Sequence, residues 1–398
     1  MGFEMIEDVG DSGFNNGTNI KVIGVGGGGG NAVEHMIASG VKGVEFICAN
    51  TDAQALKSSS SQRFIQLGRT GLGAGGKPQV GRDAAEQAQA QIRETLTGAH
   101  MLFITAGMGG GTGTGAAPVV ARIAREMGIL TVAVVTKPFE FEGTKRLGHA
   151  ESGLEELEKN VDSLIVVLNE KLLEVYGDDI SQKEAFAKAN DVLKNATGGI
   201  AEIINVPGMI NADFEDVKTV MGEPGKAMMG TAVASGADRA RLAAEQAVVC
   251  PLLDGVDLSG AKGVLVNITA DDSLKLSETR EAMNAIRAYA SPDAHIIFGT
   301  VNDPSMGDSL RVTVLATGLS RAKAASKAAP TLTVLRTGTD AAPLSMGAAL
   351  GGASVEASQI PAIWRNPRGG APSAHVSALM QGGMEEMEIP AFLRKQAD

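Results

Sequence analysis

Cysteine, aromatic residues and long apolar runs are scarce in this 398-residue sequence. Its two cysteines exclude a disulfide framework and a multi-cysteine zinc site, and such low use of cysteine suits a reducing compartment. No apolar run is long enough to cross a bilayer. The first residues, MGFEMIEDVGDSG, are acidic and have no apolar segment, so we do not expect them to form a signal peptide. These absences predict a soluble, cytoplasmic protein without direct membrane insertion.

Basic residues are in the minority as well. The chain has 35 Lys and Arg against 46 Asp and Glu, a formal net charge of −11. This balance argues against general binding to nucleic acid or to anionic membranes, because both carry negative charge themselves. Hydrophobic residues make up 44% of the chain, which is enough for two domains with cores of their own.

Short apolar runs alternate with amphipathic stretches from residue 20 onward. Helical patterns separate the apolar runs, which are typical of strands buried on both faces of a mostly parallel sheet. The predicted strands cover residues 20–25, 44–49, 101–106, 129–136 and 163–168. After a flexible N-terminal extension of residues 1–19, we therefore predict an α/β domain with a Rossmann-like parallel sheet over residues 20–181.

The rhythm changes after residue 181. The pattern predicts a long central helix over residues 182–208 and then a smaller α+β domain over residues 209–322. The second domain is expected to contain strands at 264–269, 294–301 and 310–317, with one clear long helix, SETREAMNAIRAYA, among them.

Small and polar residues dominate the rest of the chain. This composition predicts a disordered linker over residues 323–384, followed by a short peptide tail over residues 385–398. Apolar anchors beside a proline and a basic residue suggest that the tail docks on partners; they are Ile389, Pro390, Phe392, Leu393 and Arg394.

An upstream segment, IPAIWRN, repeats the pattern of the tail segment IPAFLRK. It contains Trp364, the only tryptophan of the chain, in an otherwise small-residue region. We therefore predict a possible second docking motif around Ile360, Pro361, Trp364 and Arg365.

Two glycine-rich loops carry the chemistry of the α/β domain. They read GVGGGGGNAVEHM (24–36) and GMGGGTGTGAAP (107–118), and each follows a predicted strand and precedes a predicted helix. Glycines let backbone N–H groups approach phosphate oxygens, and the N-terminus of the following helix attracts anions. Pro118 is expected in the first turn of the second helix, where its missing N–H costs nothing. Two such loops on neighbouring strands predict a phosphate cradle.

Three ligand classes compete for these loops. Gly24, Gly26 and Gly29 with Asp52 match a dinucleotide fingerprint, but a dehydrogenase would leave the second loop without a role. The segment 71–77, GLGAGGK, resembles a P-loop, but Pro78 stands where Ser or Thr is needed and no strand leads straight into a helix. A nucleoside triphosphate held by both loops uses all of these features.

The chain resembles the tubulin and FtsZ superfamily, and the bacterial FtsZ family most of all. The resemblance rests on GGGTGTG (109–115), ANTDAQAL (49–56), VVTKPFEFEG (134–143), the pair Asn190–Asp191, NADFEDV (211–217) and the tail IPAFLRKQAD. It covers residues 20–320 and the tail. It implies a GTPase domain, a central helix and a smaller C-terminal domain.

The resemblance also implies a site for GTP or GDP with Mg²⁺. Glu142 and Arg146 would contact the ribose and phosphate region, Phe186 would stack on guanine, and Asn190 would read the base edge unless Asp191 does so. The nucleotide-binding residues carried over by position are Gly27, Gly28, Gly29, Gly30, Asn31, Thr51, Asp52, Gly109, Gly110, Gly111, Thr112, Gly113, Thr114, Glu142, Arg146, Asn169, Phe186 and Asn190. We predict no particular side chain as a ligand of the metal.

The segment NADFEDV has two readings. On its own, Asp213 and Asp216 would be capping charges at the start of a helix. The resemblance implies instead that the loop at 209–217, with Asn211, Asp213 and Asp216, completes the GTPase site of the next subunit. A head-to-tail contact of this kind propagates as a filament. A scaffold that polymerises but hardly hydrolyses GTP is the alternative, and the two aspartates favour the enzyme.

The same resemblance implies a role in cell division. The chain would form protofilaments of the bacterial division ring at mid-cell, beneath the inner membrane. Its tail would bind membrane-tethering and regulatory partners such as FtsA and ZipA.

Overall fold

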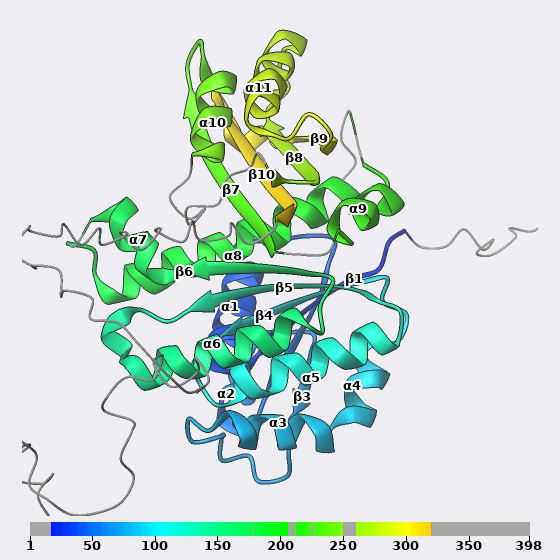
Figure 1. Cartoon of the computed structure of the whole chain (residues 1–398), viewed down its shortest axis with the longest axis vertical. Helices are drawn as coiled ribbons and strands as arrows, with labels where there is room; N and C mark the ends of the chain where they lie inside the picture. The colour runs from blue at the N-terminus through cyan, green and yellow to red at the C-terminus, as the bar shows by residue number, and fades with distance from the viewer. Residues whose placement is uncertain are drawn as a thin grey trace, which may run out of the picture. The chain divides into compact units, whose positions relative to one another are not determined.

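Ten strands form one hydrogen-bonded sheet in the computed structural model (Figure 1), in the order β3-β2-β1-β4-β5-β6-β7-β10-β8-β9. The structure describes residues 17–177, 179–205, 210, 212–223, 226–249 and 260–319. The predicted linker, tail and second docking motif lie outside these residues, as do Asn211 and most of the N-terminal extension.

The first half of the sheet confirms the predicted parallel arrangement. Neighbouring strands from β3 to β6 pair in parallel, and β1 is buried along its whole length. These strands are β1 (Ile20–Val25), β2 (Glu45–Asn50), β3 (Arg63–Gln66), β4 (Met101–Gly107), β5 (Leu130–Lys137) and β6 (Ser163–Leu168). The short edge strand β3 is not predicted by the sequence, because only its Ile65 is buried among apolar neighbours.

Helices cover both faces of this half. Successive strand residues point to opposite faces, so Val22 and Phe103 pack on one side while Ile23 and Ile104 pack on the other. The helices are α1 (Gly26–Ala38), α2 (Ala53–Lys57), α3 (Pro78–Gln87), α4 (Gln89–Leu96), α5 (Thr112–Glu126), α6 (Thr144–Glu158) and α7 (Asn169–Tyr176), with a 3₁₀ turn η1 at Glu140–Glu142.

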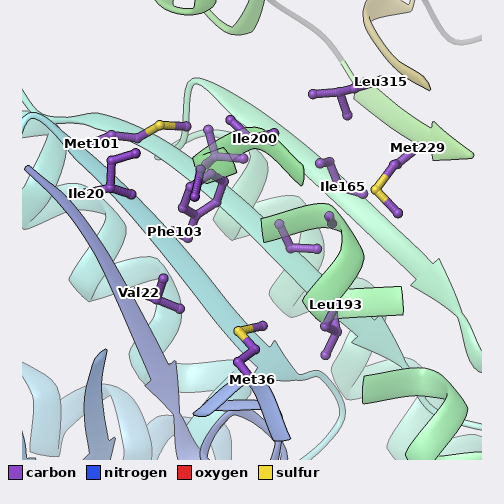
Figure 2. Close-up of a cluster of buried hydrophobic side chains, with 14 of the residues drawn as sticks. Ile20, Val22, Met36, Met101, Phe103, Ile165, Leu193, Ile200, Met229 and Leu315 are labelled. Carbon is purple, nitrogen blue, oxygen red and sulfur yellow. The ribbon is translucent and has the colours of Figure 1, made fainter. Parts of the chain in front are cut away.

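The long helix α8 (Gln182–Asn205) joins the two halves of the sheet. Its Leu193 and Ile200 belong to a cluster that also contains Phe103 of β4, Met229 of β7 and Leu315 of β10 (Figure 2). Residues far apart in the sequence therefore share one core around this helix.

The second half is mostly antiparallel. β10 (Ser309–Leu319) pairs antiparallel with both β7 (Lys226–Ser235) and β8 (Gly263–Ala270), and β9 (His295–Asn302) closes the edge in parallel with β8. The helices here are α9 (Phe214–Met221), α10 (Arg239–Val248) and α11 (Leu276–Tyr289), with a 3₁₀ turn η3 at Pro304–Met306. The predicted strands and the predicted long helix are present. The sequence does not predict β7 and α10, which are rich in small residues.

Pro118 is not where the sequence places it. α5 begins at Thr112, so Pro118 is its seventh residue, and the prediction of a first-turn position is wrong. The glycine loop itself supplies the first turns of the helix. Pro118 therefore stands where an N–H would otherwise donate to the carbonyl of Thr114.

A buried ion pair holds α10 against the start of α11. Arg239 is 6% exposed, and its guanidinium lies 2.8 Å from Glu278 Oε1 and 2.9 Å from the hydroxyl of Ser273. The hydrogen bond from Arg239 holds the pKa of Glu278 below its ordinary value. Because the folded-state pKa is depressed, the pair stabilises the fold fully above the unfolded-state pKa, and this contribution is lost as pH falls through the folded-state pKa.

Replacing Glu278 by glutamine should lower the free energy of unfolding at pH 7 by about 2 to 3 kcal/mol, because Arg239 would keep a buried charge without its partner. Below about pH 4.3 the difference from the wild type should shrink, since Glu278 then takes up its proton in the unfolded state. Denaturant titrations at several pH values measure both effects. Glu245→Gln is the control, because Glu245 pairs with Arg241 at the surface and its loss should change little. A loss that is the same at every pH would contradict the ion-pair explanation.

Candidate nucleotide-binding site

The two glycine loops lie side by side at one edge of the sheet. β1 pairs with β4 in parallel, with Val25 opposite Ala106, so both strands end at the same edge. This confirms that the loops follow neighbouring strands. Because β2, β5 and β6 run in the same direction, the segments after them reach this edge too. Ligands of open α/β sheets bind at such an edge.

Several loop glycines have no room for a side chain. A Cβ on Gly29 would lie 2.3 Å from the carbonyl oxygen of Thr105, and one on Gly24 would lie 2.4 Å from that of Gly29. Gly26 has φ +74°, and a Cβ there would lie 2.8 Å from the backbone nitrogen of Gly113. These glycines are needed because the backbone of the first loop touches itself, β4 and the second loop.

The second loop is packed in the same way. A Cβ on Gly109, which has φ +95°, would lie 2.7 Å from the carbonyl oxygen of Arg146. One on Gly113 would lie 2.7 Å from that of Gly107, and one on Gly111 would lie 2.8 Å from Ala74. The loop is therefore fixed against β4, α6 and the segment before α3.

Three other glycines face open space. Nothing lies within 4 Å of a Cβ placed on Gly27, Gly30 or Gly110. Gly28 is intermediate, at 3.0 Å from Gly107. At the open positions a ligand can approach the backbone without meeting a side chain.

The helices that follow the loops are suited to an anion. Neither α1 nor α5 has an acidic residue in its first turn, and neither has a side chain that caps its N-terminus. Their first N–H groups therefore have no partner within their own helix. A cavity of about 90 Å³ lies beside Gly26, Gly27, Gly30 and Asn31. The N-termini of two helices that follow adjacent strands favour the binding of a phosphate group between them.

The predicted threonines and Asp52 beside the loops make hydrogen bonds within the protein, each with a different partner. Thr51 Oγ1 and Thr112 Oγ1 are 2.6 Å apart, so the loop after β2 is joined to the start of α5. Thr114 is 3% exposed and accepts a hydrogen bond of 2.8 Å from the Gly109 N–H, which fixes the shape of the second loop. Asp52 caps α2 by accepting a bond of 2.8 Å from the Gln54 N–H.

A third glycine-rich segment, residues 71–77, borders the same edge. The Gly73 N–H donates to the carbonyl of Thr51 over 3.0 Å, and Lys77 N would lie 2.9 Å from a Cβ on Gly111. The sequence pattern excludes this segment as a P-loop and predicts no other role for it. Its high glycine content is the signal that could have predicted a position beside the two glycine loops.

An aromatic cluster follows β5. Phe139 is 1% exposed; its ring stacks on that of Phe141, at 5.1 Å between centroids, and lies perpendicular to that of Phe186, at 5.4 Å. Phe186 itself is 39% exposed, so part of its ring is open to a ligand. Glu142 accepts a bond of 3.0 Å from the Phe139 N–H and pairs with Arg146 at 3.1 Å.

Asn169 is the buried polar residue at this edge that is best suited to contact a ligand. It begins α7 at the end of β6, is 4% exposed, and its Oδ1 has no hydrogen-bond partner within the described part of the chain. A buried polar atom without a partner is costly, so Asn169 is a candidate to hydrogen-bond a ligand at this edge of the sheet.

Asn190 and Asp191 are neighbours on α8 but differ in their surroundings. Asn190 lies four residues after Phe186 on α8 and so shares its face of the helix. Asp191 Oδ1 is 2.9 Å from His35 Nε2 of α1 and 3.2 Å from Lys194 Nζ. Burial alone would raise the pKa of Asp191, but the bond to His35 and the charge of Lys194 outweigh it and hold that pKa below the ordinary value.

Asp213 and Asp216 lie at the opposite edge of the sheet. Phe214 beside them packs near His100, at 6.1 Å between ring centroids, and His100 directly precedes β4. β4 spans roughly 20 Å at about 3.3 Å per residue before the second glycine loop begins. Figure 1 likewise shows α7 and α9 toward opposite ends of α8. The two aspartates therefore cannot reach the glycine loops of their own chain.

Asp213 also has the structural role expected of a capping residue. It caps α9 by accepting a bond of 2.7 Å from the Asp216 N–H, and both aspartates are exposed. No group of three or more metal-ligating side chains occurs among the residues that the structure describes. Within the same residues, no helix has the length and apolar character needed to cross a bilayer.

Comparison with known proteins defines the class. Residues 19–177 match the Tubulin/FtsZ family, GTPase domain, and residues 225–320 match the FtsZ family, C-terminal domain. The fold is also that of CetZ2 from Haloferax volcanii, with a TM-score of 0.64 at 22% identity over 76% of this chain and 94% of that one. The molecule is a tubulin-like GTPase.

Individual relatives narrow the class to one family. The chain is 51% identical to the cell division protein FtsZ of Pseudomonas putida over 402 residues, covering both chains fully. It is 51% identical to that of Coxiella burnetii, covering 94% of this chain and 96% of the other. The structure of an empty FtsZ dimer from M. jannaschii superposes with a TM-score of 0.73 at 41% identity, covering 76% and 88% of the two chains. The chain belongs to the FtsZ family of cell-division proteins.

Proposed function

We propose that the chain binds GTP at the edge formed by its glycine loops, assembles head to tail, and hydrolyses GTP at the contact between subunits. The observation that carries this proposal is the separation of Asp213 and Asp216 from the glycine loops of the same chain. In a head-to-tail contact the aspartates of one subunit meet the loops of the next. The division of the chain into domains at residues 181, 208, 322 and 384 is part of the same proposal.

The phosphates would lie over the open glycines Gly27, Gly30 and Gly110, between the N-termini of α1 and α5. Backbone N–H groups would donate to the phosphate oxygens, and the hydroxyl of Thr112 lies at the start of α5 beside them. Mg²⁺, when bound, would neutralise phosphate charge. Glu142 and Arg146 would contact the ribose side.

Guanine would lie against the exposed part of Phe186. The unpartnered Oδ1 of Asn169 can accept a hydrogen bond from the N–H groups of guanine. Because Asp191 is held by His35 and Lys194, we assign the second base contact to Asn190.

The catalytic step would be completed by the neighbouring subunit. Asp213 and Asp216 carry negative charges that can orient and polarise the attacking water, and phosphoryl transfer depends mainly on such positioning. Asn211 would belong to the same loop. A subunit without a neighbour would then hold GTP but not hydrolyse it.

Turnover measured against protein concentration tests this proposal. With GTP and Mg²⁺, the rate per subunit should be near zero below a threshold concentration and rise above it, as pelletable polymer appears. GDP should give no polymer at the same concentrations. A rate per subunit that does not depend on concentration would mean that each monomer hydrolyses alone. Polymer without turnover would favour a scaffold instead.

Two exposed leucines should lie in the head-to-tail contact. Leu72 is 88% exposed in the glycine-rich segment beside the loops. Leu276 is 83% exposed at the start of α11, shortly after the end of β8. β8 pairs with β9, and β9 forms a bridge to Ile210, which lies three residues before Asp213. Leu276→Arg should raise the threshold concentration at least about tenfold, because it buries a charge in a contact core. GTP affinity should not change.

Val249→Arg is the matched control, since Val249 is 66% exposed at the end of α10. It should leave the threshold unchanged. If Leu276→Arg raised the threshold concentration no more than Val249→Arg does, the start of α11 would not belong to the polymer contact.

The tail would recruit the polymer to the division site through partners such as FtsA and ZipA. A peptide of residues 385–398 should bind them, and Phe392→Ala should weaken binding about tenfold or more by removing a buried aromatic anchor. A peptide of residues 358–370, with Ile360, Pro361, Trp364 and Arg365, should compete more weakly. No competition at any tail-binding partner would remove the second motif from the proposal. Fluorescence anisotropy with scrambled peptides measures both.

A further inference from the structure

The third glycine-rich segment, residues 71–77, ends in a cation that the proposed function does not use. Lys77 directly precedes α3, and its side chain is exposed. Among the residues that the structure describes, its ammonium group has no hydrogen bond and no ion pair. The first turn of α3 has no acidic residue either. The positive charge of Lys77 is therefore available to a bound anion.

The backbone at Lys77 lies against the start of α5. A Cβ on Gly111 would lie 2.9 Å from the Lys77 nitrogen, and one on Gly115 would meet the carbonyl oxygen of Pro78. Five bonds of about 1.5 Å let a lysine ammonium reach roughly 6 Å from its own Cα. Nothing lies within 4 Å of a Cβ on Gly110, so the loop is open next to Gly111. Lys77 can therefore reach a group that is bound in front of the first turn of α5.

The two faces of the sheet indicate which phosphate lies nearest to Lys77. Met36 of α1 and Leu193 of α8 pack on one face, whereas Ala85 of α3 and Val120 of α5 pack on the other. Figure 1 shows the same separation, with α3 beside α5 and away from α8. A nucleotide with guanine against α8 and its phosphates between the N-termini of α1 and α5 extends from the first face toward the second. Its γ-phosphate, the group furthest from guanine, would then lie on the side of Lys77.

We propose that Lys77 is a specificity-determining residue, which binds the γ-phosphate of GTP and makes the site prefer GTP to GDP. The inference rests on the nucleotide site proposed above. An ammonium group acts on phosphate oxygens as a point charge and needs no bidentate geometry. The backbone N–H groups of the glycine loops would hold the phosphates that both nucleotides share, so GDP gains little from Lys77. The segment is not a P-loop, but its lysine would do what the lysine of a P-loop does.

The test is nucleotide binding to the full chain below the polymerisation threshold, where contacts between subunits do not contribute. GDP is compared with GMPPCP, a GTP analogue whose β–γ methylene bridge prevents turnover, by competition against a fluorescent GDP. Lys77→Gln should weaken GMPPCP about tenfold, the lower end of what a hydrogen bond to a charged group contributes, since the lysine is exposed. The affinity for GDP should stay within about twofold of the wild type. Lys77→Arg, which keeps the charge, should restore most of the preference for GMPPCP.

Lys159→Gln is the matched control, because it removes the same charge at the opposite edge of the sheet. Lys159 is exposed and directly follows α6. Arg146 in the first turn of α6 touches the second glycine loop at Gly109, and the 15 residues of the helix span about 20 Å. Both affinities should therefore equal those of the wild type. A loss of GMPPCP affinity as large as that in Lys77→Gln would mean that only the overall charge matters, against the inference.

Equal losses for GMPPCP and GDP in Lys77→Gln would overturn the inference, because Lys77 would then shape the loop instead of binding the γ-phosphate. Unchanged affinity for both nucleotides would overturn it too, and either result would leave the proposed function intact. Wild-type protein that binds neither nucleotide would overturn both. Without nucleotide, Lys77→Gln should melt at the temperature of the wild type, since the exposed ammonium group has no partner to lose.

Discussion

Replacing Asp213 by asparagine should lower GTP turnover about a hundredfold or more, while GTP still binds as in the wild type and polymer still forms. Asp213 caps α9, and asparagine caps a helix as well as aspartate does, so this variant removes the charge and keeps the local fold. Under the proposed function, the site contact that is lost would belong to the neighbouring subunit, because Asp213 lies at the opposite edge of the sheet from the glycine loops. Loss of one group that stabilises a transition state commonly costs about two to three orders of magnitude in rate.

Glu215→Gln is the matched control for this prediction. Glu215 is an exposed acid in the same first helical turn and pairs with Lys218 at 3.2 Å, so it tests whether any negative charge on α9 suffices. Its turnover should stay near that of the wild type. Asp213→Ala should add a modest loss of stability, about 1 kcal/mol, from the missing cap. Full turnover in Asp213→Asn would show that the carboxylate does not take part in hydrolysis.

Much of the α/β half could be predicted from the sequence. Its strands are continuous apolar runs, so β1, β4, β5 and β6 lie within a residue or so of their predicted bounds. The position of the glycine loops also follows from the pattern, since a loop between a buried strand and a helix must lie at the carboxyl edge of the sheet. Phe186 and Asn190 on one helical face follow from their spacing of four residues.

The elements that the sequence did not predict share a physical cause. β7 and α10 are built largely from alanine, glycine and small polar residues, and their burial comes from the neighbours that they pack on. Neither strand nor helix periodicity is strong in such segments. Pro118 shows the same limit: the glycine loop continues into α5, and nothing in the local sequence marks that the helix has already started.

Individual roles within the glycine loops could not be predicted at all. Gly29 and Gly30 are neighbours of the same type, yet one touches the backbone of β4 and the other faces open space. Likewise, only the fold shows that Asp191 contacts His35. These assignments depend on contacts between segments that are 60 or more residues apart in the chain.

Gly29→Ala and Gly30→Ala should therefore have opposite effects on the stability of the nucleotide-free protein. Both positions lie in α1, where alanine is favoured over glycine by about 1 kcal/mol. At Gly29 a methyl group would stand 2.3 Å from the Thr105 carbonyl oxygen, and moving β4 or α1 apart should cost roughly 3 kcal/mol, more than the helix gains. We expect Gly29→Ala to lower the melting temperature and to lose GTP binding, because the two loops no longer fit together.

At Gly30 the methyl group meets nothing within 4 Å, so the helical gain of about 1 kcal/mol should remain and the nucleotide-free protein should melt slightly higher than the wild type. GTP affinity should nevertheless fall about tenfold, because the added methyl occupies space that we assign to the ligand. Thermal melts without nucleotide and GTP titrations of both variants decide the matter. If Gly30→Ala bound GTP as tightly as the wild type, the open glycines would not lie under the phosphates, and the cradle would have to be formed by the N-terminus of α5 alone.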